Sequence, residues 1–300
     1  MIALVDGDLI LYRIGFTTET DSEDIARIRT DELVESILEE TGASEYEVWL
    51  SDNREGNFRY EIWQDYKANR TQPRPKHYEV IKEHLIKEWG ARIAYGMEAD
   101  DALGCRQSKI YYQGFNEQLN TVICSIDKDL LQVYGEHYNF VRKEWLFVSP
   151  WEGLQWFYKQ ILIGDSSDNV KGCKGIGPVK AGRAVDRIPA EAGEEALFQE
   201  VYEVYKKQEK GWSSQEILDH ILLVGRLLKI KQKEEEELWQ LPAFPKLLQT
   251  MDSPKLSSTP PLQEAPIQST EPTMQESGGG LSALGKQMDT TLKASLPALT

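Results

Sequence analysis

Acidic residues recur just after short apolar runs in this chain, in a pattern that chance rarely produces. The residues that share this placement are Asp6, Asp52, Glu98, Asp100, Asp101, Asp127, Asp129, Asp165 and Asp168. Carboxylates that converge without basic partners repel one another, and they stay ionised at neutral pH only when cations neutralise them. Oxygen ligands suit Mg²⁺ or Mn²⁺, whereas zinc favours Cys and His. The pattern therefore predicts a divalent metal site.

The apolar runs that precede these acids predict strands. They are short, rich in β-branched or aromatic residues, and separated by stretches long enough for helices. The runs cover residues 2–5, 46–50, 91–95 and 121–126. This alternation is typical of an α/β fold with a largely parallel sheet, in which ligands collect beyond the carboxyl ends of the strands. Acids far apart in sequence would therefore meet at one edge.

A site of this kind could hydrolyse phosphodiesters. Two divalent ions about 4 Å apart stabilise the attacking water and the leaving oxygen of an in-line phosphoryl displacement, and they lower the pKa of that water. A single Asp at a strand end more often caps a helix or forms a turn. Because the same placement recurs along the chain, we favour a nuclease over a set of unrelated caps.

Composition indicates an intracellular globular protein. The chain has 300 residues, 40% of them hydrophobic, which allows one large or two ordinary domains. We expect a soluble, cytoplasmic protein without membrane contact, because there is no signal-peptide core and no apolar run approaches the roughly 20 residues that span a bilayer. The Cys and His residues are dispersed, so they predict neither disulfides nor a zinc site. They are Cys105, Cys124, Cys173, His77, His84, His137 and His220.

The last 52 residues, 249–300, differ from the rest of the chain. They are rich in Ser, Thr, Pro, Gln and Gly, and this composition predicts disorder. We favour a solvated tether over a segment that binds a protein partner, although sparse leucines leave the second interpretation open. These leucines are Leu281, Leu284, Leu292 and Leu296.

A net charge of −15 opposes nucleic-acid binding, which draws on Lys and Arg, but the bases are concentrated in two places. The first region, 54–92, mixes cations with aromatic rings, a combination that suits unpaired strands. An amphipathic helix with a solvated basic side explains this segment alone equally well.

If residues 66–70 are helical, Lys67 and Arg70 share a face and could reach one phosphate. Pro73 and Pro75 would then separate this helix from a second one that begins near Lys76, and the whole would form a mobile arch.

The second basic region follows the last pair of acids. Its glycines permit a tight turn, and backbone amides at the start of the next helix could hold phosphates of one duplex strand. The residues that would bind DNA here are Lys171, Lys174, Gly175, Gly177, Lys180 and Arg183. Farther along, apolar residues recur at helical spacing through 190–248, which predicts helices that pack on the core.

Four motifs occur in order and resemble those of the flap endonuclease and 5′-3′ exonuclease family, including phage 5′-nucleases and the 5′-nuclease domain of bacterial DNA polymerase I. They lie within residues 1–190. The motifs are Val5-Asp6-Gly7, Glu98-Ala99-Asp100-Asp101, Asp127-Lys128-Asp129 and Gly164-Asp165-Ser166-Ser167-Asp168-Asn169. The resemblance implies a PIN-like α/β fold whose mainly parallel sheet is flanked by helices, with a helical arch and a helix-three-turn-helix.

The resemblance also implies roles for individual residues. The first ion would be held by Asp6, Asp52, Glu98 and Asp100, and the second by Asp101, Asp127, Asp129, Asp165 and Asp168, with Asp100 touching both. Lys67 and Arg70 would steady the scissile phosphate and Tyr66 would stack near the unpaired end. Residues 175–181 would bind duplex backbone and a K⁺ ion. The family usually has lysine where this chain has Val179, so Lys180 would substitute for it and alter binding strength rather than chemistry.

The expected organisation is a nuclease domain at 1–163 with an arch at 54–90, a helical region at 164–248, and the tail. The expected function is a 5′-3′ exonuclease or flap endonuclease that uses two Mg²⁺ ions, with Mn²⁺ as a substitute. Its substrates would be DNA with 5′ ends, flaps or junctions, and RNA–DNA hybrids are a further option, in a bacterial or phage-infected cell. A PIN-like ribonuclease and a non-catalytic DNA-junction binding module are the alternatives.

Overall fold

A six-stranded, mainly parallel sheet forms the centre of the structure, a computed structural model that describes residues 1–52, 56–112 and 120–242. Its strand order is β3-β2-β1-β4-β5-β6. The first five strands run parallel to their neighbours, and only β6 is antiparallel. The strands are β1 Ile2–Asp6, β2 Glu45–Ser51, β3 Arg92–Ala94, β4 Thr121–Cys124, β5 Gly135–Asn139 and β6 Glu144–Val148. The predicted α/β class and the first four strands are confirmed, whereas β5 and β6 were not predicted.

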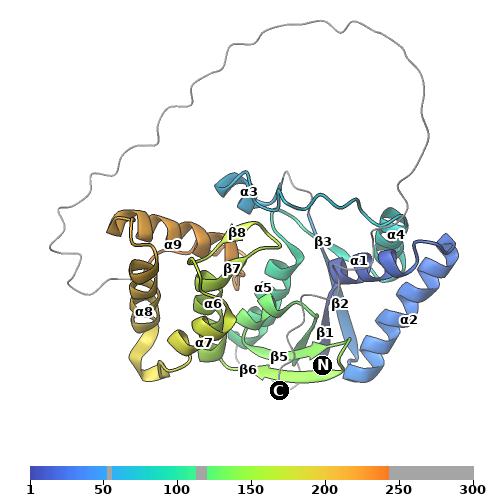
Figure 1. Ribbon diagram of the computed structural model, residues 1–300. Coiled ribbons are helices and arrows are strands. Elements are labelled where there is room, and N and C mark those ends of the chain that lie inside the picture. The colour runs from blue at the N-terminus through green and yellow to red at the C-terminus, as the bar shows by residue number, and fades with distance from the viewer. Residues whose placement is uncertain (53–55, 113–119, 243–300) are drawn as a thin grey trace, which may run out of the picture. The chain divides into compact units, whose positions relative to one another are not determined.

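Alternating side chains of the central strands cover the sheet with two hydrophobic layers. In β1, which is buried throughout, Ala3 and Val5 face one layer, and Ile2 and Leu4 face the other. The first layer packs against α1 Gly7–Thr17, α2 Glu23–Thr41 and α4 Tyr78–Glu88. The second packs against α5 Ala99–Tyr112 and the 3₁₀-helix η2 Lys128–Gln132. Figure 1 shows α1, α2 and α4 on one side of β1 and β2, and α5 on the other.

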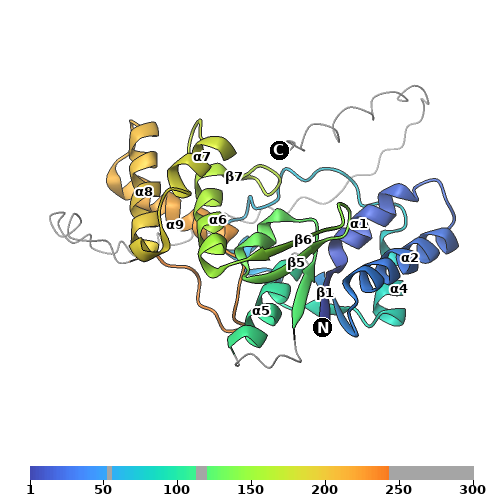
Figure 2. The ribbon, with the colours of Figure 1, turned by 90° about the horizontal axis from the view of Figure 1, so that it is seen from below.

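A second hydrophobic cluster is made by the later helices, which Figure 2 shows gathered at the side of the molecule away from α1, α2 and α4. They are α6 Pro150–Ile163, α7 Pro178–Val185, the 3₁₀-helix η3 Ala190–Ala192, α8 Gly193–Gln208 and α9 Ser214–Leu228. Capping boxes at Ser149 and Ser213 fix the starts of α6 and α9, because each satisfies otherwise unpaired amides. Between α6 and α7, a short hairpin joins β7 Gly164–Asp165 to β8 Val170–Lys171. The expected nuclease domain ends at residue 163, yet α6 packs with the later helices in this cluster. The domain boundary at 163/164 remains a prediction.

The segment expected to form a helical arch is mostly irregular. It starts with the short helix α3 Phe58–Ile62 and continues through turns to α4, along the upper edge of Figure 1. The helix predicted over 66–70 is wrong, because Lys67 has the left-handed φ of 56° that interrupts a right-handed helix. The second helix, predicted to begin near Lys76, begins at Tyr78 with His77 as its N-cap.

Residues 54 and 55 of the predicted arch, residues 243–248, and the predicted disordered tail at 249–300 lie outside the described residues. Within the described ranges, no helix is both long and apolar enough to cross a membrane.

The close approach of two backbones at the hairpin gives a stability prediction. A Cβ on Gly172 would lie 2.3 Å from the carbonyl carbon of Ile163 and 2.4 Å from the amide nitrogen of Gly164. We expect Gly172→Ala to lower the free energy of unfolding by about 1–3 kcal/mol or more, as overpacking does. Gly211→Ala is the matched control, since a Cβ there meets open space. Denaturant unfolding measures both, and equal stabilities of the two variants would contradict the assigned hairpin packing.

Candidate functional site

The carboxyl edge of the sheet brings the first and third acidic motifs together. Asp6 ends β1, and its carboxylate caps α1 by accepting a hydrogen bond from the Leu9 amide at 3.2 Å. The Ser125 hydroxyl, just after β4, donates to Asp6 at 2.9 Å and accepts from the Asp127 amide at 3.0 Å. Because β1 and β4 are parallel neighbours, their ends place Asp6 and Asp127 on the same side of the sheet.

Burial and mutual repulsion raise the pKa of several of these acids. Burial, followed by the charge of Asp8, raises the pKa of Asp6 to about 7. Burial and the charge of Asp127 raise the pKa of Asp129 to about 8. Burial and the neighbouring Asp6 raise the pKa of Asp100, and burial also raises the pKa of Asp127. These carboxyls therefore face one another with too little positive charge to hold all of them ionised.

Two bases between α3 and α4 compensate the charges of Glu98 and Asp168. Lys67 donates to Glu98, and Arg70 donates to Asp168 at 2.5 Å. Burial alone would raise the pKa of Glu98, but the charges of Lys67 and Arg59 lower it to about 2. The Lys67 amide also donates to the Asp168 carbonyl oxygen at 2.9 Å. The segment predicted as an arch is therefore tied to the second and fourth acidic motifs.

Tyr66 lies in this contact as well. Its hydroxyl donates to Asp168 at 2.7 Å and to Glu98 at 3.2 Å. The side chain is only 1% exposed and belongs to the hydrophobic cluster of the later helices. The stacking role implied for Tyr66 by the family resemblance does not fit this position, because a base cannot reach the ring face.

Asp101 differs from the other acids because all of its oxygen contacts are structural. It is fully buried and accepts hydrogen bonds from Arg59 Nη1 at 2.5 Å and Nη2 at 2.9 Å, and from the Lys231 amide at 3.0 Å. Arg59 is itself 2% exposed. This pair would have to break before Asp101 could hold an ion, and breaking a buried pair is strongly unfavourable. Asp101 therefore does not fit the ligand role predicted for it.

The last two predicted acids, Asp165 and Asp52, are partly buried. Asp165 accepts hydrogen bonds from the amide and hydroxyl of Ser167, both at 2.7 Å. Asp52 accepts from the Gly96 amide at 2.9 Å, which directs it toward the connection between β3 and α5. Asp8, which our sequence analysis missed, accepts from the Ser51 amide at 3.2 Å. Its spacing of two residues from Asp6 was the available signal.

The residues present fit divalent cations in charge and chemistry, because the facing carboxyls with raised pKa values lack compensating bases. As they stand, however, the described residues include no group of three His, Cys, Asp or Glu side chains arranged to hold a metal ion. The contacts of Lys67 and Arg70 explain part of this result, since they engage Glu98 and Asp168. Cation binding would therefore compete with these two bases.

Two buried glutamines connect the third acidic motif to the segment after α9. Gln160 donates to Asp129 at 2.8 Å and accepts from Gln132 at 2.7 Å. Gln132 also donates to the Leu228 carbonyl oxygen at 2.7 Å and accepts from the Ile230 amide at 3.1 Å. Arg59 makes a parallel connection, donating to the carbonyl oxygens of Leu227 and Lys229. The segment after α9 thus contacts the supports of two acidic motifs.

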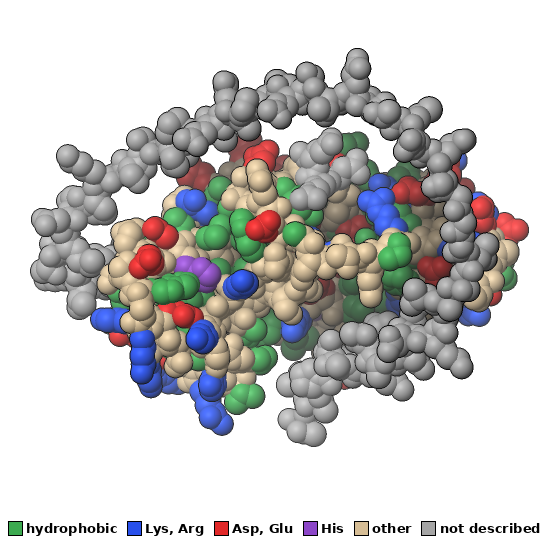
Figure 3. Space-filling model, turned by 45° about the horizontal axis from the view of Figure 1, so that its top comes forward, with side chains coloured by type: hydrophobic (Ala, Val, Ile, Leu, Met, Phe, Trp, Pro, Cys, Tyr) green, Lys and Arg blue, Asp and Glu red, His purple; other side chains and the backbone are tan. Residues whose placement is uncertain are grey.

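The second basic region forms the turn between β8 and α7. Gly175 has a left-handed φ of 70°, and α7 starts at Pro178 immediately after Gly177. Lys180 donates to the Gly175 carbonyl oxygen at 2.8 Å, while Val179 is 67% exposed. The four basic side chains predicted to bind DNA here are all exposed; they are Lys171, Lys174, Lys180 and Arg183. Figure 3 shows several basic side chains gathered at the lower left of the visible face.

The mainly parallel sheet with acids at its carboxyl edge agrees with the predicted PIN-like α/β fold. The sequence model of the 5′-3′ exonuclease N-terminal resolvase-like domain matches residues 1–155, and the chain belongs to this 5′-3′ exonuclease family. The fold agrees with the solved structure of T5 5′-exonuclease with bound zinc ions, at a TM-score of 0.50 and 18% identity over 75% of this chain and 99% of the other.

Relatives of known name agree with this assignment. The chain is 31% identical over 202 residues to thermostable DNA polymerase I from Thermus aquaticus, a match that covers 62% of this chain and 24% of the polymerase. It is 30% identical over 209 residues to a 5′-3′ exonuclease from Mycoplasma genitalium, covering 59% of this chain and 68% of that protein. The chain thus spans about a quarter of the polymerase and about two thirds of the separate exonuclease.

The raised pKa values predict how stability depends on pH in the metal-free protein. Unfolded Asp titrates near pH 3.9, whereas Asp6 and Asp129 titrate at about 7 and about 8 in the folded state. Between these limits the folded state binds more protons, so stability falls as pH rises. In EDTA, we expect the melting temperature to be lower at pH 8 than at pH 5.5, and Mg²⁺ to restore it at pH 8. A higher melting temperature at pH 8 in EDTA would contradict the repulsion described here.

The glutamine contact predicts a change in metal affinity. Gln160→Leu removes the donor to Asp129, and loss of such outer contacts typically lowers metal affinity roughly 10–100-fold. Gln155→Leu is the matched control, since Gln155 is a buried residue of α6 that donates to Val185 and Ile188. Mn²⁺ binding by electron paramagnetic resonance measures both variants. Equal Mn²⁺ affinities would exclude the positioning role of Gln160.

Proposed function

We propose that this protein is a metal-dependent 5′-nuclease that hydrolyses DNA phosphodiesters at 5′ ends, flaps or junctions. The observation that carries the proposal is the convergence of Asp6, Asp100, Asp127 and Asp129. Besides burial, the charge of Asp127 raises the pKa values of the other three acids, and the charge of Asp6 raises the pKa of Asp100. Membership of the 5′-3′ exonuclease family supports the same activity. When bound, two divalent ions would stabilise the attacking and leaving oxygens and acidify the attacking water.

The ligand set proposed here is narrower than that expected from the sequence. The ions would be Mg²⁺ by preference, with Mn²⁺ as a substitute. They would be held by Asp6, Glu98, Asp100, Asp127, Asp129, Asp165 and Asp168, with Asp52 as a further ligand. Asp101 would instead position α5 through Arg59. Asp8 would add negative charge beside Asp6, because its charge raises the pKa of Asp6.

Lys67 and Arg70 would act on the scissile phosphate. Burial alone would lower the pKa values of both bases. The carboxylates of Glu98 and Asp168 outweigh burial, so the pKa values of Lys67 and Arg70 are raised. Both would remain cationic throughout the physiological range. On substrate binding they would exchange these carboxylates for phosphate oxygens, freeing Glu98 and Asp168 for cations. The bases would thereby couple substrate binding to completion of the site.

Substrate would extend to both sides of the acid cluster. Exposed bases of the turn before α7 would hold one strand of a duplex without reading its sequence. On the other side, Tyr12 stacks near Phe16 and Tyr78, with Arg74 4.4 Å from the Tyr78 ring centroid. Tyr12 and Phe16 are 37% and 47% exposed, so they could stack on unpaired bases. At the turn before α7, Lys180 already donates to the Gly175 carbonyl oxygen. A K⁺ ion at this turn should therefore contribute little to DNA binding.

Cleavage of 5′-labelled DNA tests the proposal. A 5′ flap, a blunt duplex, a single strand and an RNA flap are compared with Mg²⁺ and with EDTA. We expect Mg²⁺-dependent release of flaps or short 5′ products, and Asp127→Asn to lower turnover by more than the roughly 10–100-fold typical of outer contacts, while DNA binding persists. Asp219→Asn, an exposed change on α9, is the control.

Undiminished turnover by Asp127→Asn would refute the site assignment. Tight junction binding without cleavage would favour a non-catalytic module, and cleavage of the RNA flap alone would favour a ribonuclease.

A further inference from the structure

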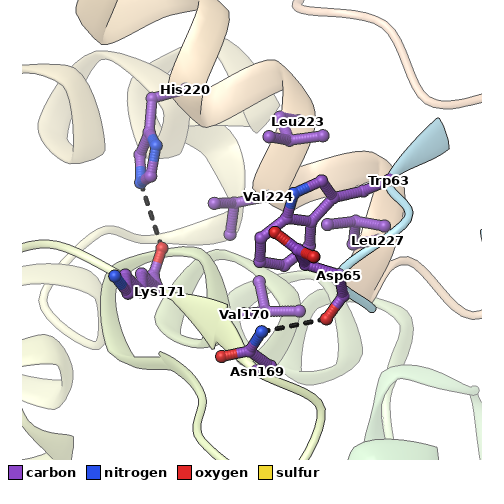
Figure 4. Close-up of a pocket in the computed structure, with 9 residues that line it drawn as sticks. All are labelled: Trp63, Asp65, Asn169, Val170, Lys171, His220, Leu223, Val224 and Leu227. Carbon is purple, nitrogen blue, oxygen red and sulfur yellow. Dashed lines mark hydrogen bonds between the residues drawn. The ribbon is translucent and has the colours of Figure 1, made fainter. Parts of the chain in front are cut away.

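A pocket of about 230 Å³ lies between α9, the segment after α3 and the β7–β8 hairpin. Its apolar lining comes from Val170 and from Leu223, Val224 and Leu227 of α9. The Trp63 ring lies across from Val170 (Figure 4). A volume below the roughly 300–1,000 Å³ of pockets for drug-sized ligands suits one small, flat group. The lining therefore favours a planar ligand that can stack on Trp63.

One polar group in this pocket has unused hydrogen-bonding capacity. The Asp65 carboxylate points into it beside Trp63 (Figure 4), and within the described residues nothing donates to that carboxylate. The backbone carbonyl of Asp65, in contrast, accepts hydrogen bonds from the Ala68 amide and from Asn169 Nδ2 at 2.9 Å. The carboxylate is thus an acceptor held on a fixed backbone, ready for a ligand with donors.

The walls of the pocket are fixed by contacts that also shape the acid cluster. Asp65 precedes Tyr66, and Asn169 follows Asp168, whose carboxylate binds the Tyr66 hydroxyl. His220 on α9 hydrogen-bonds to the Lys171 carbonyl oxygen at 3.0 Å, and burial lowers the pKa of His220, so it stays neutral near pH 7. The exposed Lys171 side chain stands at the rim. A ligand here would lie next to the proposed cleavage site, with a cation available for phosphate.

We propose that this pocket binds a single unpaired guanine of a DNA strand held at the acid cluster, an inference that rests on the proposed nuclease function. Guanine presents two adjacent donors, N1–H and N2–H, which one carboxylate can accept together, whereas thymine presents only one. Its flat face stacks on Trp63, as bases stack on aromatic side chains in single-strand binding proteins. Lys171 contacts the attached phosphate. The pocket thereby gives preference for guanine at one unpaired position.

The first test uses free nucleotides and the full chain in EDTA at pH 6.5, where neither cleavage nor metal enters. Binding of guanosine 5′-monophosphate and thymidine 5′-monophosphate is compared by NMR titration. We expect a preference for guanosine of about tenfold, the size of one bidentate base contact. Asp65→Asn should abolish the preference. Glu61→Gln, an exposed change on α3 outside the pocket, should retain it.

The second test moves one guanine along the unpaired strand of a flap, with thymine elsewhere, and measures binding without Mg²⁺. One position should bind more tightly by about tenfold, and inosine there, which lacks the N2 amine, should lose most of this gain. Trp63→Phe should weaken binding at that position while keeping the guanine preference, because a smaller ring still stacks.

The outcomes separate the two proposals. Equal binding of both nucleotides, or a guanine preference that survives Asp65→Asn, would overturn the pocket assignment even if flaps are cleaved. A guanosine preference that depends on Asp65 in a protein that neither binds nor cleaves flaps would keep the pocket's base selectivity but overturn its link to a DNA strand and the nuclease function.

Discussion

Repulsion among buried carboxylates is the constraint on which the rest of this structure depends. Parallel strands bring the acids of separate motifs to one edge of the sheet, and burial there raises the pKa values of Asp6, Asp100, Asp127 and Asp129. Such a cluster is tolerated only if protons, bases or bound cations reduce its charge. The fold supplies bases at two of the acidic motifs and leaves the centre of the cluster to protons or cations.

The supporting bases come from one segment and are anchored by another. Arg59, Lys67 and Arg70 all lie between β2 and α4, yet Arg59 is held by carbonyl oxygens at the end of α9. Gln132 and Gln160 extend the same C-terminal anchorage to Asp129. The matched family domain covers residues 1–155, so part of what fixes its acids lies beyond it. Nuclease activity would therefore require the later helices for site geometry as well as for DNA contacts.

Much of this arrangement could be predicted from the sequence, since it follows from local patterns. Apolar runs before acids indicated four strands of the sheet, and the glycines of residues 172–177 indicated the turn before α7. What could not be predicted depended on tertiary contacts. Arg59 and Lys67 are both bases in one segment, and nothing local shows that Arg59 becomes buried against Asp101 while Lys67 adopts a left-handed φ. Likewise, no sequence signal separates the buried Tyr66 from the exposed Tyr12.

The charge balance also explains why an acidic protein can be expected to bind a polyanion. Acids in the cluster are candidates for neutralisation by cations, while exposed bases lie at the turn before α7, where a duplex strand would pass. Lys67 and Arg70 stand between these regions and can pair with either carboxylate or phosphate. Substrate and cations would therefore favour each other's binding, since each removes a partner that competes with the other.

The central claim is that the acid cluster holds protons which divalent cations displace. Calorimetric titration with Mg²⁺ at pH 7.5, repeated in buffers of different ionisation enthalpy, counts the protons released on binding. Release of protons that becomes smaller in Asp100→Asn is the predicted result, because Asp100 is one of several buried acids with raised pKa values. Mg²⁺ binding without proton release, or no binding at all, would contradict this account of the site.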